Sequence, residues 1–182
     1  MKIIKTKIPD LLIIEPSVFE DDRGYFFETY NEKNYKKEGI ENTFVQDNEA
    51  YSSYGVIRGL HYQLAPYAQA KLVRVVKGRA YDVAVDLRKE SPTYLQWVGV
   101  ELSGENKRQF LVPRGFAHGY SVLEDDTLFV YKCDNLYHKE AERSINPLDK
   151  TLNIDWKVPE DKLLFSPKDL QNPILENAEY NF

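Results

Sequence analysis

The sequence has little cysteine or histidine and no long apolar run. Its one cysteine, Cys133, excludes an internal disulfide and any zinc site built on several thiolates. The longest apolar run, Leu11 to Ile14, is far too short for a membrane-spanning helix or the core of a signal peptide. We therefore expect a protein of a reducing compartment, the cytoplasm, with no membrane partner.

The charge is mildly acidic, with 24 Lys and Arg against 29 Asp and Glu, a formal net charge of −5. This balance, without any long basic run, argues against a nucleic-acid partner. It does not exclude a small anionic ligand, because such a ligand needs only a few cations placed around it. The length of 182 residues and the 42% hydrophobic content suit one core. We predict a single domain over residues 1–182.

Alternating patterns predict a mainly β protein. Apolar and other side chains alternate over residues 81–87, 97–102 and 128–133, as in strands with two different faces. The 13 tyrosines and 9 phenylalanines also suit pleated surfaces. Many short strands separated by turns predict a sandwich or barrel of antiparallel strands with few helices. We expect short helical segments only at Asn31–Glu38, with Asn31 as N-cap, and at Ser166–Leu170.

Two of the three histidines lie in patterned segments. His118 ends a P-x-G-x-x-H segment, which many cupin jelly rolls use to point a histidine into the barrel. A metal-binding cupin would place further histidines near His61, but Gln63 stands where the second one is needed. Two histidines fall short of the usual three or four protein ligands, so we expect a cupin barrel without a metal. His61 is then either a proton-transfer group or a core histidine.

Three basic residues are candidate anion ligands. Arg23 lies on a predicted turn, Arg58 stands three residues before His61, and Lys71 shares strand parity with Val73 and Val75. A cation that points into a barrel needs an anionic partner, because an uncompensated buried charge is costly. A phosphate-bearing ligand would supply that partner. Each of the three, taken alone, could also be an ordinary surface side chain.

Tyr131 lies at the centre of the strand predicted over 128–133. It is either a core tyrosine or a phenolic proton donor, the second role being open to it if nearby cations lower the pKa of its hydroxyl. Other aromatic residues could line a pocket or simply pack it. They are Phe26, Tyr62, Phe116 and Tyr137.

Eight segments between Arg23 and Asp169 follow one another in a recognisable order. They are Asp22–Phe26, Phe44–Asn48, Arg58–Gln63, Ala70–Val75, Asp82–Arg88, Pro113–Gly119, Val130–Lys132 and Leu163–Asp169. In this order they resemble the nucleotide-sugar epimerases of the dTDP-4-dehydrorhamnose 3,5-epimerase (RmlC) family, members of the cupin superfamily.

The resemblance implies an isomerase that converts dTDP-4-dehydro-6-deoxy-D-glucose to dTDP-4-dehydro-L-rhamnose in dTDP-L-rhamnose biosynthesis. It also implies a homodimeric cupin jelly roll without a cofactor. His61 would be the base, Asp169 would orient it, Lys71 would stabilise the enolate and Tyr131 would be the acid. The same resemblance matches further positions to substrate contacts, with Tyr137 stacking on the thymine. These positions are Arg23, Phe26, Glu28, Gln46, Asn48, Arg58, Lys71, His118, Tyr137, Glu142 and Lys168.

Several alternatives stay open at this point. The segment 142–150 departs from the family pattern near the expected nucleotide end of the site, so it leaves nucleotide selectivity undecided. Some relatives epimerise only C3 or only C5 with the same histidine and tyrosine. A 3,4-ketoisomerase would run the same enolisation, and a non-catalytic jelly-roll sugar binder would use these side chains as ligand contacts only.

Overall fold

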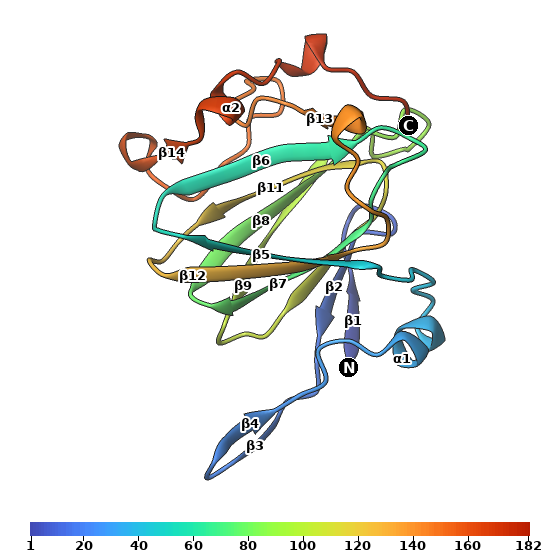
Figure 1. Cartoon of the computed structure of the whole chain (residues 1–182), viewed down its shortest axis with the longest axis vertical. Helices are drawn as coiled ribbons and strands as arrows, with labels where there is room; N and C mark the ends of the chain where they lie inside the picture. The colour runs from blue at the N-terminus through green and yellow to red at the C-terminus, as the bar shows by residue number, and fades with distance from the viewer.

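The computed structural model describes residues 1–182 as two facing β-sheets that form a jelly-roll barrel (Figure 1). The fold predicted from the alternating pattern is therefore confirmed. The first sheet is antiparallel throughout. Its strands, in spatial order, are β1 (Lys2–Lys5), β2 (Leu12–Glu15), β10 (Gln109–Val112), β7 (Lys71–Lys77), β12 (Thr127–Cys133) and β5 (Gln46–Ser52).

The second sheet faces the first and carries most of the motifs found in the sequence. Its antiparallel strands, in spatial order, are β13 (Glu142–Ser144), β6 (Val56–Gln63), β11 (Phe116–Val122), β8 (Arg79–Asp86) and β9 (Trp97–Ser103). The short strand β14 (Leu164–Phe165) pairs in parallel with β6. Strands that carry His61 and His118 are neighbours in this sheet, whereas those that carry Lys71 and Tyr131 are neighbours in the first.

The main core lies between the two sheets, where inward-facing side chains of both meet. Phe110 and Phe129 come from the first sheet, and Leu102 and Phe116 from the second, all of them buried. Burying one such large apolar side chain stabilises the fold by about 1.5–3 kcal/mol. Because both inner faces converge here, polar side chains on the same faces also point into the barrel.

Two further apolar clusters cover the outer faces. The segment after β13 covers the second sheet through Leu152, Trp156 and Leu175. It contains the helical turns η2 (Glu160–Lys162), α2 (Pro167–Leu170) and η3 (Leu175–Asn177), while η1 (Lys139–Ala141) precedes β13. Part of the first sheet is covered by α1 (Glu32–Lys37) through the buried ring of Tyr35. Both short helices begin as predicted, since Asn31 and Ser166 cap them with their side chains.

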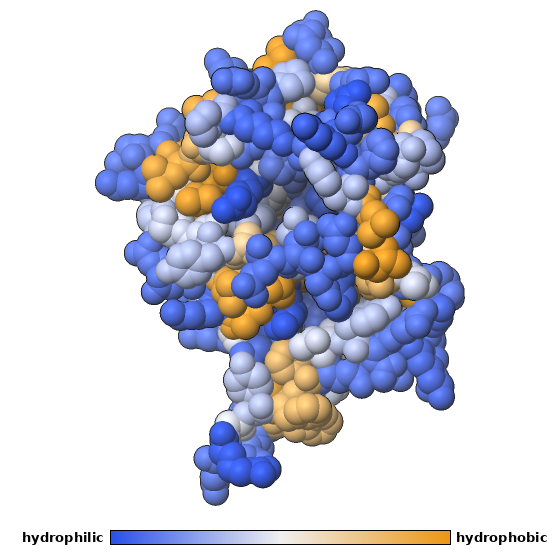
Figure 2. All heavy atoms as spheres, viewed as in Figure 1, coloured by the Kyte–Doolittle hydropathy of each residue, from blue (hydrophilic) through white to orange (hydrophobic).

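A two-stranded arm stands away from the barrel. It consists of β3 (Phe19–Asp21) and β4 (Gly24–Phe26), and Figure 1 shows it projecting from the lower end of the body. Phe19 and Phe26 are 67% and 72% exposed on it. In Figure 2 apolar surface is visible where this arm leaves the body. No helix of the structure is long and apolar enough to cross a membrane.

A register shift on β6 decides which of its side chains enter the barrel. His61 pairs with His118 and Arg58 pairs with Tyr120, so a separation of three residues on β6 faces a separation of two on β11. Both Arg58 and His61 therefore lie on the inner face. Gly59 sits in the shift with φ +149°, and a Cβ there would lie 2.6 Å from the Cα of Gly119. Only glycine allows this close approach of the two backbones.

Candidate active site

A cavity of about 390 Å³ opens between the two sheets. It gathers side chains that are far apart in the sequence, including His61, Lys71, His118 and Tyr131. The lining residues are Gln46, Asn48, His61, Tyr62, Gln63, Gln69, Lys71, Val112, Phe116, His118, Tyr131, Cys133, Tyr137 and Glu142. Most of the sequence-predicted site residues thus lie around one cavity.

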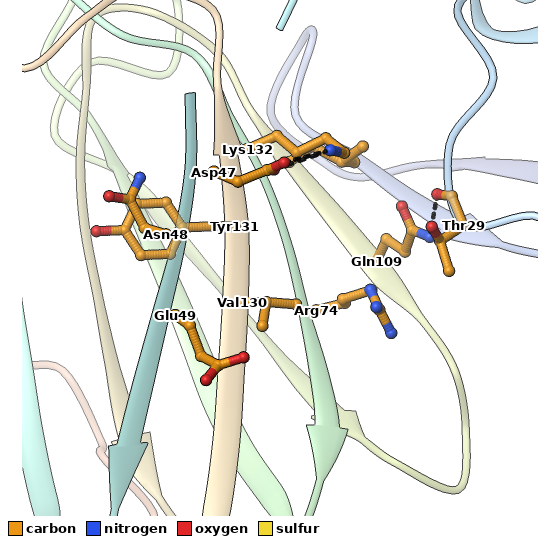
Figure 3. A pocket seen from close by; sticks show the side chains of 10 residues that line it. Thr29, Asp47, Asn48, Glu49, Arg74, Gln109, Val130, Tyr131 and Lys132 are labelled. Atoms are coloured by element: carbon orange, nitrogen blue, oxygen red, sulfur yellow. Dashed lines mark hydrogen bonds and ion pairs between the residues drawn. The ribbon is translucent and has the colours of Figure 1, made fainter. Parts of the chain in front are cut away.

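A second hollow, of about 310 Å³, lies on the outer face of the first sheet. Figure 3 shows the difference between the two faces: Asn48 and Tyr131 point to one side of β5 and β12, whereas Arg74 and Gln109 point to the other. The inner side is the one that faces His61 across the barrel. The alternation of side chains along a strand therefore separates the candidate site from this outer groove.

His61 and Asp169 form a dyad at the wall of the cavity. The His61 Nε2 lies 2.7 Å from the Asp169 Oδ1, and the imidazole keeps 31% of its surface exposed. With Nε2–H donating to the carboxylate, the Nδ1 lone pair of His61 is free to accept a proton. Asp169 itself is buried and accepts a hydrogen bond from the Ser166 hydroxyl. The dyad predicted from the family resemblance is thus present in the geometry.

The carboxylate of this dyad is held in its charged form. Burial raises the pKa of Asp169, but hydrogen bonds from His61, Ser166 and Asn172 outweigh burial and hold the pKa below its ordinary value. An ionised Asp169 fixes the tautomer of His61 and stabilises the imidazolium that proton abstraction would create. The dyad has the form of a general base and its orienting group.

Lys71 places an unpaired ammonium group in the same cavity. It makes no ion pair, and its Nζ lies 5.8 Å from the centre of the Tyr131 ring. Burial lowers its pKa, an effect that Cys133, Asp82 and Glu142 oppose. Lys71 lines the cavity, and Val73 and Val75, which share its strand parity, pack in the main core between the sheets. Such a cation is suited to a negative oxygen brought in by a ligand.

Tyr131 faces the dyad from the opposite sheet, since it lies on β12 and His61 on β6. The sequence reasoning made its role as a proton donor depend on a pKa lowered by nearby cations, and this condition is not met. Burial is the largest effect and raises the pKa of Tyr131, although Arg58 acts in the opposite direction. A raised pKa keeps the phenol protonated at neutral pH, which is the form that a proton donor needs.

A second histidine–carboxylate pair lies deeper in the barrel. The His118 Nε2 lies 2.9 and 3.0 Å from the two carboxylate oxygens of Asp82. The side chain of His118 is 7% exposed and that of Asp82 is 0% exposed. Asp82 was missed by the sequence reasoning, although a carboxylate in the alternating strand 81–87 was a signal. Asp82 occupies the Nε2 of His118. His118, expected to contact the substrate, can therefore offer the cavity only the other atoms of its ring.

The mouth of the cavity carries a small polar network. The Lys168 ammonium donates to Glu142 Oε2 at 2.8 Å, and the Tyr137 hydroxyl donates to the same oxygen at 3.1 Å. The ring of Tyr137 is 54% exposed and open to stacking by a planar ligand. Gln46 accepts from the Tyr137 backbone N–H at 3.0 Å and donates to Asn48 at 3.1 Å. These five predicted contact residues lie together at the rim.

Three predicted contact residues lie outside the cavity of their own chain. Arg23 is at the tip of the arm, exposed and paired with Asp21, and Phe26 is on the neighbouring strand. Glu28 accepts hydrogen bonds from Asn31 and Asn34 at the start of α1. A fourth, Arg58, lies on the inner face of its strand but is exposed and bonds the Ser52 hydroxyl rather than lining the cavity.

The sequence reasoning also missed polar lining residues. Cys133 lies on β12 beside Lys71 and accepts a hydrogen bond from Asn48 at 3.7 Å. Burial raises the pKa of its thiol to about 11, so it carries no charge at neutral pH. Gln69 had no motif that could have revealed it. Nowhere do three or more His, Cys, Asp or Glu side chains gather in a way that could hold a metal ion.

The fold and the site define a cupin-type barrel with a histidine–aspartate pair, a lysine and a tyrosine around one cavity. A family model described as dTDP-4-dehydrorhamnose 3,5-epimerase matches residues 5–177. The chain belongs to that family of isomerases, as the resemblance predicted.

Relatives and solved structures agree with this assignment. A dTDP-4-dehydrorhamnose 3,5-epimerase of Shigella flexneri is 54% identical over 181 residues, covering 99% of each chain. The crystal structure of the enzyme from Elizabethkingia anophelis is 54% identical with a TM-score of 0.93, covering 97% of each chain. A Legionella pneumophila epimerase in complex with dTDP-4-keto-L-rhamnose is 51% identical with a TM-score of 0.92, covering 97% of this chain and 93% of the other.

Proposed function

We propose that the protein is a 3,5-epimerase that converts dTDP-4-dehydro-6-deoxy-D-glucose to dTDP-4-dehydro-L-rhamnose. The observation that carries the proposal is the His61–Asp169 dyad, in which Nε2 and Oδ1 lie 2.7 Å apart. It stands at the wall of a cavity that Lys71 and Tyr131 also line. The names of the relatives, including one bound to dTDP-4-keto-L-rhamnose, support the choice of substrate.

The chemistry begins with the acidity that a ketone confers on its neighbours. The carbonyl at C4 acidifies the hydrogens on C3 and C5, because loss of either leaves an enolate with its charge on the C4 oxygen. The Nδ1 of His61 takes that proton, and Asp169 stabilises the resulting imidazolium. The carbon–hydrogen electron pair moves into the ring, and the C4 oxygen becomes negative.

Lys71 is the group that receives this negative charge. Its ammonium has no carboxylate partner within the chain, so it is free to bind the C4 oxygen. A preorganised donor aimed at a developing oxyanion lowers the barrier by about 3 kcal/mol. Tyr131 then returns a proton to the carbon from the face opposite His61, which inverts that centre. Cys133 is uncharged and takes no part in this sequence.

Contacts at the rim hold the nucleotide end of the substrate. Tyr137, half-exposed and fixed by Glu142, offers its ring to the base, and Lys168 supplies a cation beside it. Binding energy gained at this distance from C3 and C5 positions the sugar ring between His61 and Tyr131. The glutamate lies in the segment that departs from the family pattern, so nucleotide preference is decided at this rim.

The direct test is incubation with dTDP-4-dehydro-6-deoxy-D-glucose in heavy water, followed by proton NMR. We expect deuterium at both C3 and C5 and a product of the L-rhamno configuration. Exchange at one carbon only would reduce the function to a mono-epimerase, and a product with its carbonyl moved would make it a 3,4-ketoisomerase. Binding without any exchange would leave only a sugar binder and overturn the proposal.

A variant separates the acid from the base. Tyr131→Phe should still allow deuterium to enter at one carbon at least, because His61 and Lys71 can still form the enolate. It should fail to invert that carbon, because the proton donor on the opposite face is gone. Full inversion by this variant would remove Tyr131 from the acid role.

We also propose that the active unit is a homodimer in which each arm completes the site of the other subunit. The support is the position of Arg23 and Phe26, which match substrate-contacting residues but stand outside the cavity of their own chain, on an exposed apolar arm. An exposed apolar surface of this kind marks a place where another chain packs. We place the reaction in the cytoplasm, where the single unpaired thiol Cys133 stays reduced.

Subunit complementation tests this arrangement. Arg23→Ala and His61→Asn variants, each weak alone, should regain activity when subunits are exchanged, because half of the mixed sites in each heterodimer contain both wild-type residues. A mixture of His61→Asn and Asp169→Asn is the matched control, because both residues come from the same chain and neither site of the heterodimer then has a wild-type dyad. Monomeric protein by light scattering with full activity would contradict the proposal.

A further inference from the structure

Gln63 lies on β6 at the position where a metal-binding cupin would have its second histidine, and the reaction as described makes no use of it. It lines the cavity and is only 4% exposed. A buried amide needs partners for its two N–H donors and for its oxygen, because an unsatisfied polar group in the interior is costly. The partners of this amide therefore indicate what the residue does.

The amide of Gln63 bonds to the backbone of two loops. Its Nε2 donates to the carbonyl oxygen of Tyr67 at 2.7 Å and to that of Leu136 at 3.2 Å. Its Oε1 accepts from the backbone N–H of His138 at 2.6 Å. Both amide hydrogens are thus used within the chain, and neither remains for a ligand. The rings of Tyr67 and His138, one from each loop, stack with their centroids 3.7 Å apart.

Two other glutamines of the cavity bond to the second of these loops. Gln69 donates to the carbonyl oxygen of Asn135 at 2.8 Å, and Gln46 accepts from the backbone N–H of Tyr137 at 3.0 Å. Residues 135–138 belong to no strand, and the four backbone groups that the glutamines hold bond to no other backbone group. Glutamine side chains therefore do here what a neighbouring strand does elsewhere in the barrel.

We propose that Gln63 is a positioning residue for the nucleotide, because it fixes the backbone on both sides of Tyr137. Its bonds to Leu136 and His138 flank the residue whose half-exposed ring is offered to the base. A ring that is held before the ligand arrives loses less conformational freedom on binding, which strengthens binding. The inference rests on the proposed function where it assigns this ring to the base; the hydrogen bonds belong to the protein alone.

Calorimetric titration with dTDP, together with steady-state kinetics, tests the inference. Gln63→Met keeps the length of the side chain but removes all three hydrogen bonds. We expect the Kd of dTDP to rise about tenfold, because binding must then order a freed side chain and its loop. KM should rise with it, while kcat stays within about threefold, since His61, Lys71 and Tyr131 are unchanged. An unchanged Kd, or a fall in kcat with an unchanged KM, would overturn the inference.

A double-mutant cycle with Tyr137→Ala shows whether Gln63 acts through that ring. Tyr137→Ala alone should raise the Kd of dTDP by about tenfold, the usual effect of losing one ring stacked on a base. Adding Gln63→Met to Tyr137→Ala should then change Kd by less than about twofold, because the ring that it positions is gone. If Gln63→Met weakens binding by the same factor with and without the ring, Gln63 does not act through Tyr137, and the inference fails.

The matched control is Thr127→Val, at the other end of β12 from this loop. Thr127 is 1% exposed, and its hydroxyl donates to the carbonyl oxygen of Glu124 at 2.8 Å. This change also removes a buried side-chain bond to a loop, so it should lower stability while leaving the Kd of dTDP unchanged. A weakening as large as that of Gln63→Met would show that any such loss disturbs binding, and the inference would be wrong.

Hydrogen exchange on the wild type covers the case in which Gln63→Met does not fold. We expect the backbone amides of Tyr137 and His138 to be protected before dTDP is added, because glutamine oxygens already accept from them. Protection that arises only with dTDP would mean that the ligand orders this loop, which contradicts the inference. Failure of the wild type to bind dTDP would instead refute the proposed function and leave this exchange result standing.

Discussion

Two histidine–aspartate pairs lie on adjacent strands of the same sheet, yet their surroundings differ. The His61 side chain is 31% exposed in the cavity, and its carboxylate comes from α2, outside the barrel. His118 is 7% exposed, and its partner Asp82 comes from the neighbouring barrel strand β8. Accessibility therefore separates an imidazole that a substrate can reach from one that the barrel closes off.

The two carboxylates also respond to folding in opposite directions. Burial raises the pKa of both, but in Asp169 the hydrogen bonds from His61, Ser166 and Asn172 prevail and lower it. In Asp82 burial prevails, and the pKa is raised. The comparison teaches that the number of donors around a buried carboxylate, more than its burial, decides how firmly it holds its charge.

Removing the accessible imidazole should have the largest effect. His61→Asn should lower kcat by about a thousandfold, because positioned general bases contribute about 10²–10⁴ in rate and the other imidazole of the cavity, His118, is only 7% exposed. Binding of dTDP, measured by calorimetry, should stay within a few-fold of the wild type. If turnover survives this change, His61 is not the base, and the two histidine–aspartate pairs do not differ in function.

Removing the orienting carboxylate should have the next largest effect. Asp169→Asn keeps the shape but loses the negative charge, so kcat should fall by about a hundredfold while KM changes little. Steady-state kinetics at several pH values measures this. Ser166→Ala is the matched control, because it removes one donor to Asp169 and leaves the contact with His61. If Ser166→Ala lowers kcat as much as Asp169→Asn, then the capping of α2, and not the charge of Asp169, sustains the rate.

Acid should destabilise the protein through carboxylates whose pKa is lowered. Asp169 is one; Asp149 is another, where burial raises the pKa but backbone N–H groups of Leu175, Leu152 and Thr151 outweigh it. These carboxylates stabilise the folded state above their unfolded pKa of about 4. This stabilisation is lost as the pH falls through their pKa values in the folded protein. We expect a loss of about 1–2 kcal/mol for each between pH 5 and pH 2.

Urea unfolding at pH 2, 3, 4 and 5 measures this slope. Asp149→Asn should be less stable at pH 5 and should show a shallower loss on acidification, since its share of the proton uptake is gone. An unchanged slope in the variant would show that Asp149 is not among the carboxylates responsible.

The smallest effect concerns Tyr120, two residues from His118 on β11. Its ring stacks on Phe129 with centroids 3.9 Å apart, but its buried hydroxyl has no hydrogen-bond partner. A buried unsatisfied hydroxyl is costly, so Tyr120→Phe should leave stability unchanged or raise it by up to about 1 kcal/mol, roughly 2–4 °C in Tm. Calorimetry measures this, and a clear loss would show that the hydroxyl is bonded in solution.

The barrel strands were the most predictable part of the molecule. The alternation over 81–87, 97–102 and 128–133 matches β8, β9 and β12, because a strand with one buried face imposes a period of two on its sequence. Asn31 and Ser166 were also predictable, because a helix start needs a side chain that accepts from free N–H groups. Local physical rules of this kind act within a few residues and can be read directly.

Contacts between distant segments were not predictable by such rules. His61 and Asp169 are 108 positions apart, and only the family resemblance joined them. The pair of His118 and Asp82 was missed altogether, since neither spacing nor composition indicates which strands become neighbours. The register shift beside Gly59 is a further case: strict alternation would place Arg58 and His61 on opposite faces, whereas the structure places both inside. The sequence pattern also gave no sign that the arm of β3 and β4 lies outside the cavity of its own chain.

The source of Asp169 has a consequence for how the site is assembled. This residue belongs to the segment that covers the outside of the second sheet, and it follows every strand of the barrel in the sequence. The wall of the cavity, with His61, Lys71 and Tyr131, is built only from residues that precede this segment. A substitution that detaches the covering segment would therefore take the carboxylate away from the imidazole while every residue of the wall stays in place.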